Sequence, residues 1–136
     1  MKYNQGARKY KVNQKFFDKW SPGMAYVLGF WFADGFINEE NFSLSQHKND
    51  AYIITQIKKL MKAQHPIKKG NRNNVILNIY SKNIIDSIKR IGGTERKSKE
   101  VKFPFVPTKF LGDFIRGYFD GMDMLLFIKI RAVPRT

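Results

Sequence analysis

Two carboxylates close apolar, glycine-containing stretches of this sequence. Asp34 ends a run that begins at Met24, and Asp120 lies near the end of a second run, residues 111–121. A carboxylate at the C-terminal end of a helix meets the negative end of the helix dipole, so it needs a positively charged partner. A bound cation is the natural candidate, and two such helices side by side would bring both acidic ends together.

Both stretches carry the signals of helices that approach each other closely. Ser21 suits the N-cap of the first helix, and Pro22 suits its first turn. Gly29 and Gly117 lie 88 positions apart, which indicates an internal repeat. Small residues at every fourth position share one helix face and let another backbone come near; they are Ala25, Gly29 and Ala33 in the first helix, and Gly117 and Gly121 in the second.

The sequence between the two motif helices predicts two strand pairs and two more helices. Residues 36–37 and 42–46 form the first pair around a turn, and the second pair opens at Pro66 and continues through residues 75–80. Isoleucine-rich segments at helical spacing, residues 53–61 and 84–91, predict the helices. The predicted fold class is α+β, an αββαββα unit with a four-stranded, mainly antiparallel sheet, followed by the second motif helix.

The composition favours an anionic partner. The net charge is +14, and the pI is near 10.1. A field of this strength attracts a polyanion, above all nucleic acid. The chain has no cysteine, no apolar stretch of the ~20 residues that a membrane span needs, and no hydrophobic signal segment at its N-terminus. We expect an intracellular protein, in the cytoplasm, the nucleoid or an organelle, without a membrane partner.

The pattern divides the chain into three parts. Residues 1–12 are expected to form a flexible basic arm, and residues 13–106 the α+β domain. Residues 107–136 hold the second motif helix and the start of a second repeat. Only 15 residues follow Gly121, against the 88 that separate the two motif glycines, so we expect this second repeat to be truncated.

Residues 28–35 (LGFWFADG) and 114–121 (FIRGYFDG) resemble the two motifs of the LAGLIDADG homing endonucleases. The approaches to the helices also match, in residues 13–18 and in Lys97-Ser98 followed by Phe103-Pro104 and Pro107. The resemblance covers residues 12–121. It implies site-specific, magnesium-dependent hydrolysis of double-stranded DNA by a protein of a mobile intron, intein or free-standing element.

The resemblance also implies functional residues. Asp34 is the expected Mg²⁺ ligand and catalytic acid, because magnesium takes carboxylate oxygens together with phosphates and waters. Aligning Gly117 with Gly29 sets Met122 where the second acid belongs, and Asp120, two residues earlier, is the candidate second ligand and catalytic acid. Lys97 matches a basic residue near the scissile phosphates. The outward sheet positions are the expected DNA contacts: Ser43, Ser45, Lys68, Arg72, Asn78 and Tyr80.

Three interpretations remain open at this point. The first is an endonuclease whose second half comes from a homodimer partner or a complementing chain through the motif helices. The second is a non-catalytic nucleic-acid-binding module of the same fold, such as a decayed endonuclease, a maturase-like RNA binder or a regulator, which Met122 favours. The third is a truncated product that cannot fold alone.

Overall fold

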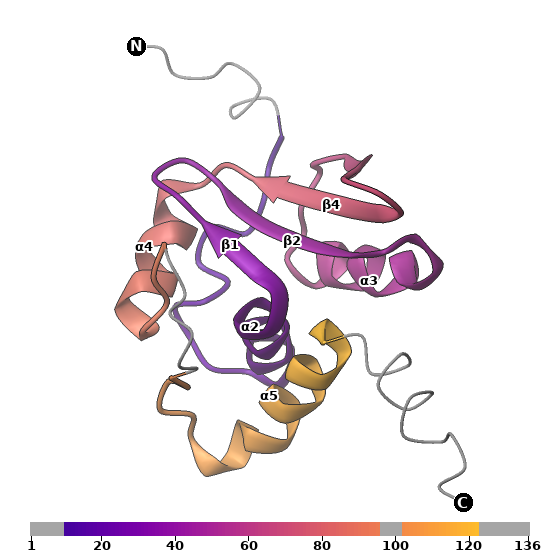
Figure 1. Ribbon diagram of the computed structural model, residues 1–136. Helices are drawn as coiled ribbons and strands as arrows, with labels where there is room; N and C mark the ends of the chain where they lie inside the picture. The colour runs from indigo at the N-terminus through magenta and orange to yellow at the C-terminus, as the bar shows by residue number, and fades with distance from the viewer. Residues whose placement is uncertain (1–9, 96–101, 123–136) are drawn as a thin grey trace, which may run out of the picture.

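An antiparallel four-stranded sheet with helices packed on one side forms the body of the protein (Figure 1). The computed structural model describes residues 10–95 and 102–122. The predicted α+β class and antiparallel sheet are confirmed, with strand order β1-β2-β4-β3. In chain order the elements are α2 (Pro22–Asp34), β1 (Gly35–Ile37), β2 (Phe42–His47), the 3-10 helix η1 (Lys48–Asp50), α3 (Ala51–Leu60), β3 (Ile67–Lys69), β4 (Asn74–Ile79), α4 (Lys82–Ile91) and α5 (Thr108–Gly121).

Helix α2 is the centre of the core. Every residue from Met24 to Phe32 is buried, so this helix has no solvent-facing stripe along most of its length. Its helical start follows from Ser21, whose Oγ accepts a hydrogen bond from the Met24 N–H at 3.0 Å, and from Pro22 in the first turn. The sheet contributes one apolar face to the same core, through Phe42, Leu44, Leu77 and Ile79, all fully buried.

Helix α5 lies along α2 with its backbone in direct contact, as the small-residue stripes predict. A Cβ atom at Gly29 would overlap the backbone oxygen of Phe114, and one at Gly117 would overlap the backbone oxygen of Tyr26. The two contacts are equivalent. Adding 88 to the numbers of Tyr26 and Gly29 gives Phe114 and Gly117, so each glycine meets the counterpart of the residue three positions before itself. The helices are therefore parallel and related by a local twofold axis that pairs each α2 residue with its counterpart 88 positions later.

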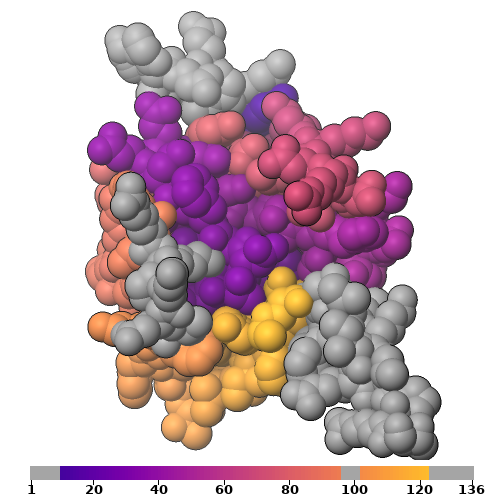
Figure 2. Space-filling view, in the orientation of Figure 1, coloured from indigo at the N-terminus to yellow at the C-terminus, as the bar shows by residue number. Residues whose placement is uncertain are grey.

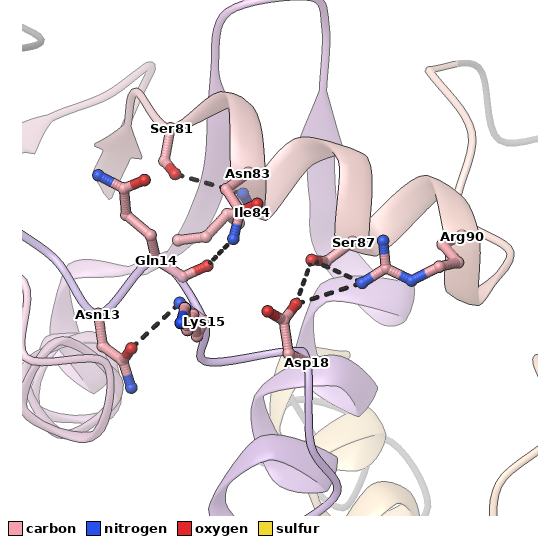
Figure 3. A network of polar contacts seen from close by, with 9 residues as sticks. All are labelled: Asn13, Gln14, Lys15, Asp18, Ser81, Asn83, Ile84, Ser87 and Arg90. Atoms are coloured by element: carbon pink, nitrogen blue, oxygen red, sulfur yellow. Dashed lines mark hydrogen bonds and ion pairs between the residues drawn. The ribbon is translucent and has the colours of Figure 1, made fainter.

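Helix α4 is tied to the segment that precedes α2 by a polar network (Figure 3). The Asp18 carboxylate accepts hydrogen bonds from Ser87 Oγ at 2.8 Å and from the Arg90 guanidinium at 3.2 Å. The Asn83 amide donates to the Gln14 backbone oxygen at 2.6 Å. Ser81 caps α4 by accepting a hydrogen bond from the Ile84 N–H at 3.2 Å. The approach to the first motif helix is thus held against α4.

The expected N-terminal arm is held down at its described end. The backbone of Lys11 pairs with Gln64 in both directions, at 2.8 and 3.3 Å. Next to this pair lies His65, only 1% exposed, with the ring of Tyr10 at 5.3 Å and the ring of Tyr80 at 6.5 Å between centroids. Neither ring nitrogen of His65 has a hydrogen-bond partner among the described residues.

Across residues 10–95 and 102–122, none of the helices combines the length and apolar character needed to cross a membrane.

We predict that Gly29→Ala destabilises the protein by about 2–3 kcal/mol, because the added methyl group forces two helix backbones apart. Urea unfolding followed by circular dichroism measures the change. Gly112→Ala is the matched control: a Cβ there meets nothing within 4 Å, so only helix propensity acts and the variant gains about 1 kcal/mol. Equal stability of the Gly29→Ala variant and the parent would refute the close packing.

We also predict a loss of stability at mildly acidic pH that originates at His65. Burial, followed by the nearby Lys58, lowers the pKa of His65 below its ordinary 6.5. The unfolded chain therefore takes up a proton as the pH falls through about 6.5, where the folded chain resists it, and the free energy of unfolding drops. His65→Phe should flatten the stability profile between pH 7.5 and pH 5 relative to a His47→Asn control, and identical profiles for the two variants would argue against this origin.

Candidate nucleic-acid interface

The strand register gathers most of the predicted DNA contacts on one face of the sheet. Ser43 pairs with Asn78, while Ser45 and Lys68 both pair with Ile76. Directly paired residues of antiparallel strands point to the same side, so these side chains share the face opposite the buried one. We call this the outer face; Figure 1 shows α2, α3 and α4 on the other side of the sheet.

The predicted contacts on the outer face differ in how exposed their side chains are. Lys68 is exposed, Ser45 and Asn78 are half-buried, and Ser43 is only 6% exposed because the paired residues Phe36 and Asn78 flank its short side chain. The Asn78 side-chain oxygen accepts a hydrogen bond from the Asn41 amide at 2.9 Å. Ser43 therefore lines the floor of the outer face rather than its surface.

The other two predicted contacts lie beyond the strands. Arg72 is exposed at the tip of the β3–β4 turn, where it adopts a positive φ of 58°. Tyr80 follows the last residue of β4 and is half-buried against the His65 ring. Lys97 lies outside the described residues.

The Asp34 carboxylate reaches the outer face from the end of α2. In the β1–β2 register Gly35 pairs with Leu44, so the next position pairs Asp34 with Ser45 on the outer face. Ser45 Oγ donates to Asp34 Oδ2 across a long 3.4 Å. Asp34 is exposed, and the chain passes directly from helix to strand because Gly35 fits against the Trp31 indole, where any Cβ would overlap the ring.

Asp120 occupies a different environment. Its half-buried carboxylate accepts a 2.5 Å hydrogen bond from the Tyr26 hydroxyl, and its backbone oxygen accepts one from the Gln46 amide at 2.8 Å. The Arg116 guanidinium lies 4.9 Å from the centre of the Tyr26 ring. Burial, then the Asp120 hydrogen bond and charge, raise the pKa of Tyr26 well above its ordinary value. Tyr26 therefore stays protonated and donates to Asp120.

The local twofold axis shows which residue corresponds to each acid. The counterpart of Asp34 is Met122, which is 43% exposed at the end of α5. The counterpart of Asp120 is Phe32, whose ring contacts Phe114 at 5.9 Å. The Tyr26–Asp120 hydrogen bond on one flank is thus replaced by an aromatic pair on the other. The acidic helix tip is present once, at Asp34, in the described structure.

Sequence patterns missed three features of this region. Gln46 occupies an inward strand position, and a polar residue in the 42-44-46 alternation was the available signal that it needed a buried partner. Tyr26 gave no comparable signal within an apolar helix. Phe36 is 49% exposed on the outer face beside Ser43. The alternation of inward and outward positions along the strand would have placed it on this face.

The donor set suits a magnesium ion only in part. Among the described residues, no group of three or more His, Cys, Asp or Glu side chains is placed to hold a metal ion. Magnesium is commonly bound by one or two carboxylates and completed by substrate phosphates and waters, so Asp34 fits the one-carboxylate case. The Met122 thioether does not offer the oxygen ligand that a second protein contact requires.

Neither the protein-family models nor the curated proteins compared with this sequence match it.

We predict that Tyr26→Phe lowers the free energy of unfolding by about 2 kcal/mol, because a half-buried carboxylate loses a charge-assisted hydrogen bond. Urea titration measures it. Tyr52→Phe is the control, since Tyr52 is 59% exposed on α3 and should change stability by less than about 0.5 kcal/mol. If both variants unfold like the parent, the Tyr26 hydroxyl does not support Asp120.

Proposed function

We propose that this chain is a LAGLIDADG-type endonuclease that binds double-stranded DNA on its outer face and hydrolyses a phosphodiester with Mg²⁺ held at Asp34. The observation that carries the proposal is the position of the Asp34 carboxylate beside Ser45, on the sheet face that also carries Lys68 and Asn78. A cleavage centre has to lie on the same surface as the DNA contacts, and the register supports that arrangement.

The charge of the chain supports a nucleic-acid ligand. Lys48 follows β2, Arg72 lies at the β3–β4 turn, and Lys68 lies on the edge strand; all three are exposed, in a chain of net charge +14. Such side chains contact phosphates and give affinity that falls as salt increases. The polar floor of the outer face is suited to base edges in the major groove, into which paired strands fit.

Sequence recognition would come from a few side chains of the outer face. Asn78 presents an amide group, and an amide suits the paired donor and acceptor of adenine. Phe36 supplies an exposed apolar surface of the kind that contacts a thymine methyl group. Lys68 and Arg72 suit guanine or the adjacent phosphates.

At the proposed centre Asp34 would hold the metal ion. Magnesium bound there supplies a Lewis acid and an activated water for hydrolysis. The Ser45 hydroxyl keeps the carboxylate on the outer face, and the DNA phosphate would complete the ligand set.

One observation favours a second candidate, a non-catalytic nucleic-acid-binding module of the same fold. Met122 is the structural counterpart of Asp34, so the described chain offers one acidic tip where a symmetric two-strand cleavage centre would use two. In this case the outer face binds DNA or RNA, and Asp34 has no catalytic role.

We predict that Asp34→Asn strongly slows cleavage while leaving binding intact. The parent is incubated with a randomised double-stranded DNA library, the bound sequences are recovered, and cleavage is measured with and without Mg²⁺. The variant should cut at least about a hundredfold more slowly, because a metal centre contributes several kcal/mol to such a step. Glu39→Gln on the β1–β2 turn is the control, since it removes one negative charge from the hairpin that follows Asp34.

The outcomes separate the two candidates. DNA binding by the parent without magnesium-dependent cleavage, unchanged in Asp34→Asn, identifies the binding module. A parallel arm with a randomised RNA library detects an RNA binder. No salt-sensitive binding to either library rejects both candidates.

A further inference from the structure

The outward face of α5 exposes an apolar stripe. Leu111, Ile115, Phe119 and Met122, here called the α5 stripe, are each 42–44% exposed. Their spacing places them together on one side of the helix. The opposite side is buried against α2 through Phe114, Gly117 and Gly121, and the space-filling view shows α5 at the surface of the molecule (Figure 2).

The local twofold axis shows that this stripe differs from an ordinary exposed surface. The α2 counterparts of Ile115 and Phe119 are Val27 and Trp31, and both are fully buried. At these two positions the motif helix is therefore covered in α2, whereas the described residues leave the α5 side chains partly exposed. The glycine face of each helix is already filled by the other, so a partner of α5 has to meet the α5 stripe.

The charges beside the stripe form a self-complementary pattern. One flank of α5 carries Lys109, Asp113, Arg116 and Asp120, which sum to zero in a chain of net charge +14. When the flank is compared with a copy of itself running in the opposite direction, each base lies opposite an acid: Lys109 opposite Asp120, and Arg116 opposite Asp113. The apolar stripe has the same symmetry, because Leu111 and Phe119 are equally distant from Ile115.

We propose that a second copy of this chain docks on the α5 stripe, with the two α5 helices antiparallel about a twofold axis near Ile115. In such a pair the same flank of each helix meets its copy, so Asp113 faces Arg116 of the partner subunit, and Lys109 lies opposite the half-buried Asp120 of the partner subunit. Leu111 packs on Phe119 of the partner subunit. The contact is apolar and uncharged overall, which suits a protein rather than a nucleic acid, and it does not depend on the proposed function.

Sedimentation velocity over a range of protein concentrations tests the proposal, in about 0.3 M salt to screen repulsion between two basic chains. We expect a concentration-dependent dimer whose Kd rises at least about tenfold in Ile115→Glu. Leu60→Glu is the control, because Leu60 is 44% exposed on α3, away from the stripe. A monomer at every concentration, or a dimer unaffected by Ile115→Glu, overturns the proposal.

A charge exchange tests the antiparallel arrangement itself. Arg116→Glu places two acids opposite each other, and Asp113→Arg places two bases opposite each other, so each variant alone should dimerise more weakly than the parent. An equimolar mixture of the two should form a heterodimer with restored affinity, because each base then faces an acid. Thermal unfolding confirms that both variants fold despite losing the 3.2 Å Arg116–Asp113 ion pair within the chain. Loss of that internal pair cannot be repaired by mixing, so failure of the mixture to restore dimers refutes the arrangement.

Discussion

The backbone contact between α2 and α5 at Gly29 and Gly117 is the constraint on which the remaining structure depends. Side chains normally separate packed helices, but here the absent Cβ atoms let two backbones touch. This fixes the crossing point and the parallel direction of the helices. Because Asp34 ends α2 and Gly35 starts β1, the contact also fixes where the carboxylate lies relative to the sheet. The position of the acidic tip is thus a consequence of two glycines.

The backbones of α2 and α5 follow the local twofold symmetry, but several of their side chains do not. Tyr26 and Asp120 form a hydrogen bond on one flank, whereas their counterparts Phe114 and Phe32 form an aromatic contact on the other. The break has a packing reason: the polar pair lies next to Gln46, at the end of β2, where an amide supplies a further hydrogen bond. A helix pair that is symmetric in its backbone therefore carries one polar flank and one apolar flank.

Local patterns predicted the elements because each pattern corresponds to a local cause. Ser21 and Ser81 cap helices through neighbouring N–H groups, and the strand alternation follows from the pleat, so Ser45, Lys68 and Asn78 were assigned to the correct shared face. What escaped prediction depends on side chains that meet from distant parts of the chain. The Tyr26–Asp120 bond joins residues 94 positions apart, and the burial of Ser43 depends on both neighbouring strands. The Mg²⁺ site, Lys97 and the partner remain predictions from the resemblance.

The outer face of the sheet and the exposed side of α5 differ in charge, and the difference bears on what each surface can bind. Asp34 is exposed at the negative end of α2, so a phosphate could approach it only with added positive charge, from the basic side chains around the outer face or from a bound cation. Helix α5 carries balanced charges, which attract no polyanion and allow a second basic chain to come near. The excess positive charge is therefore carried by other parts of the chain and not by α5, the helix proposed to pack against a second copy. Separate surfaces would allow the proposed nucleic acid and the proposed second copy to bind without competing for the same electrostatic field.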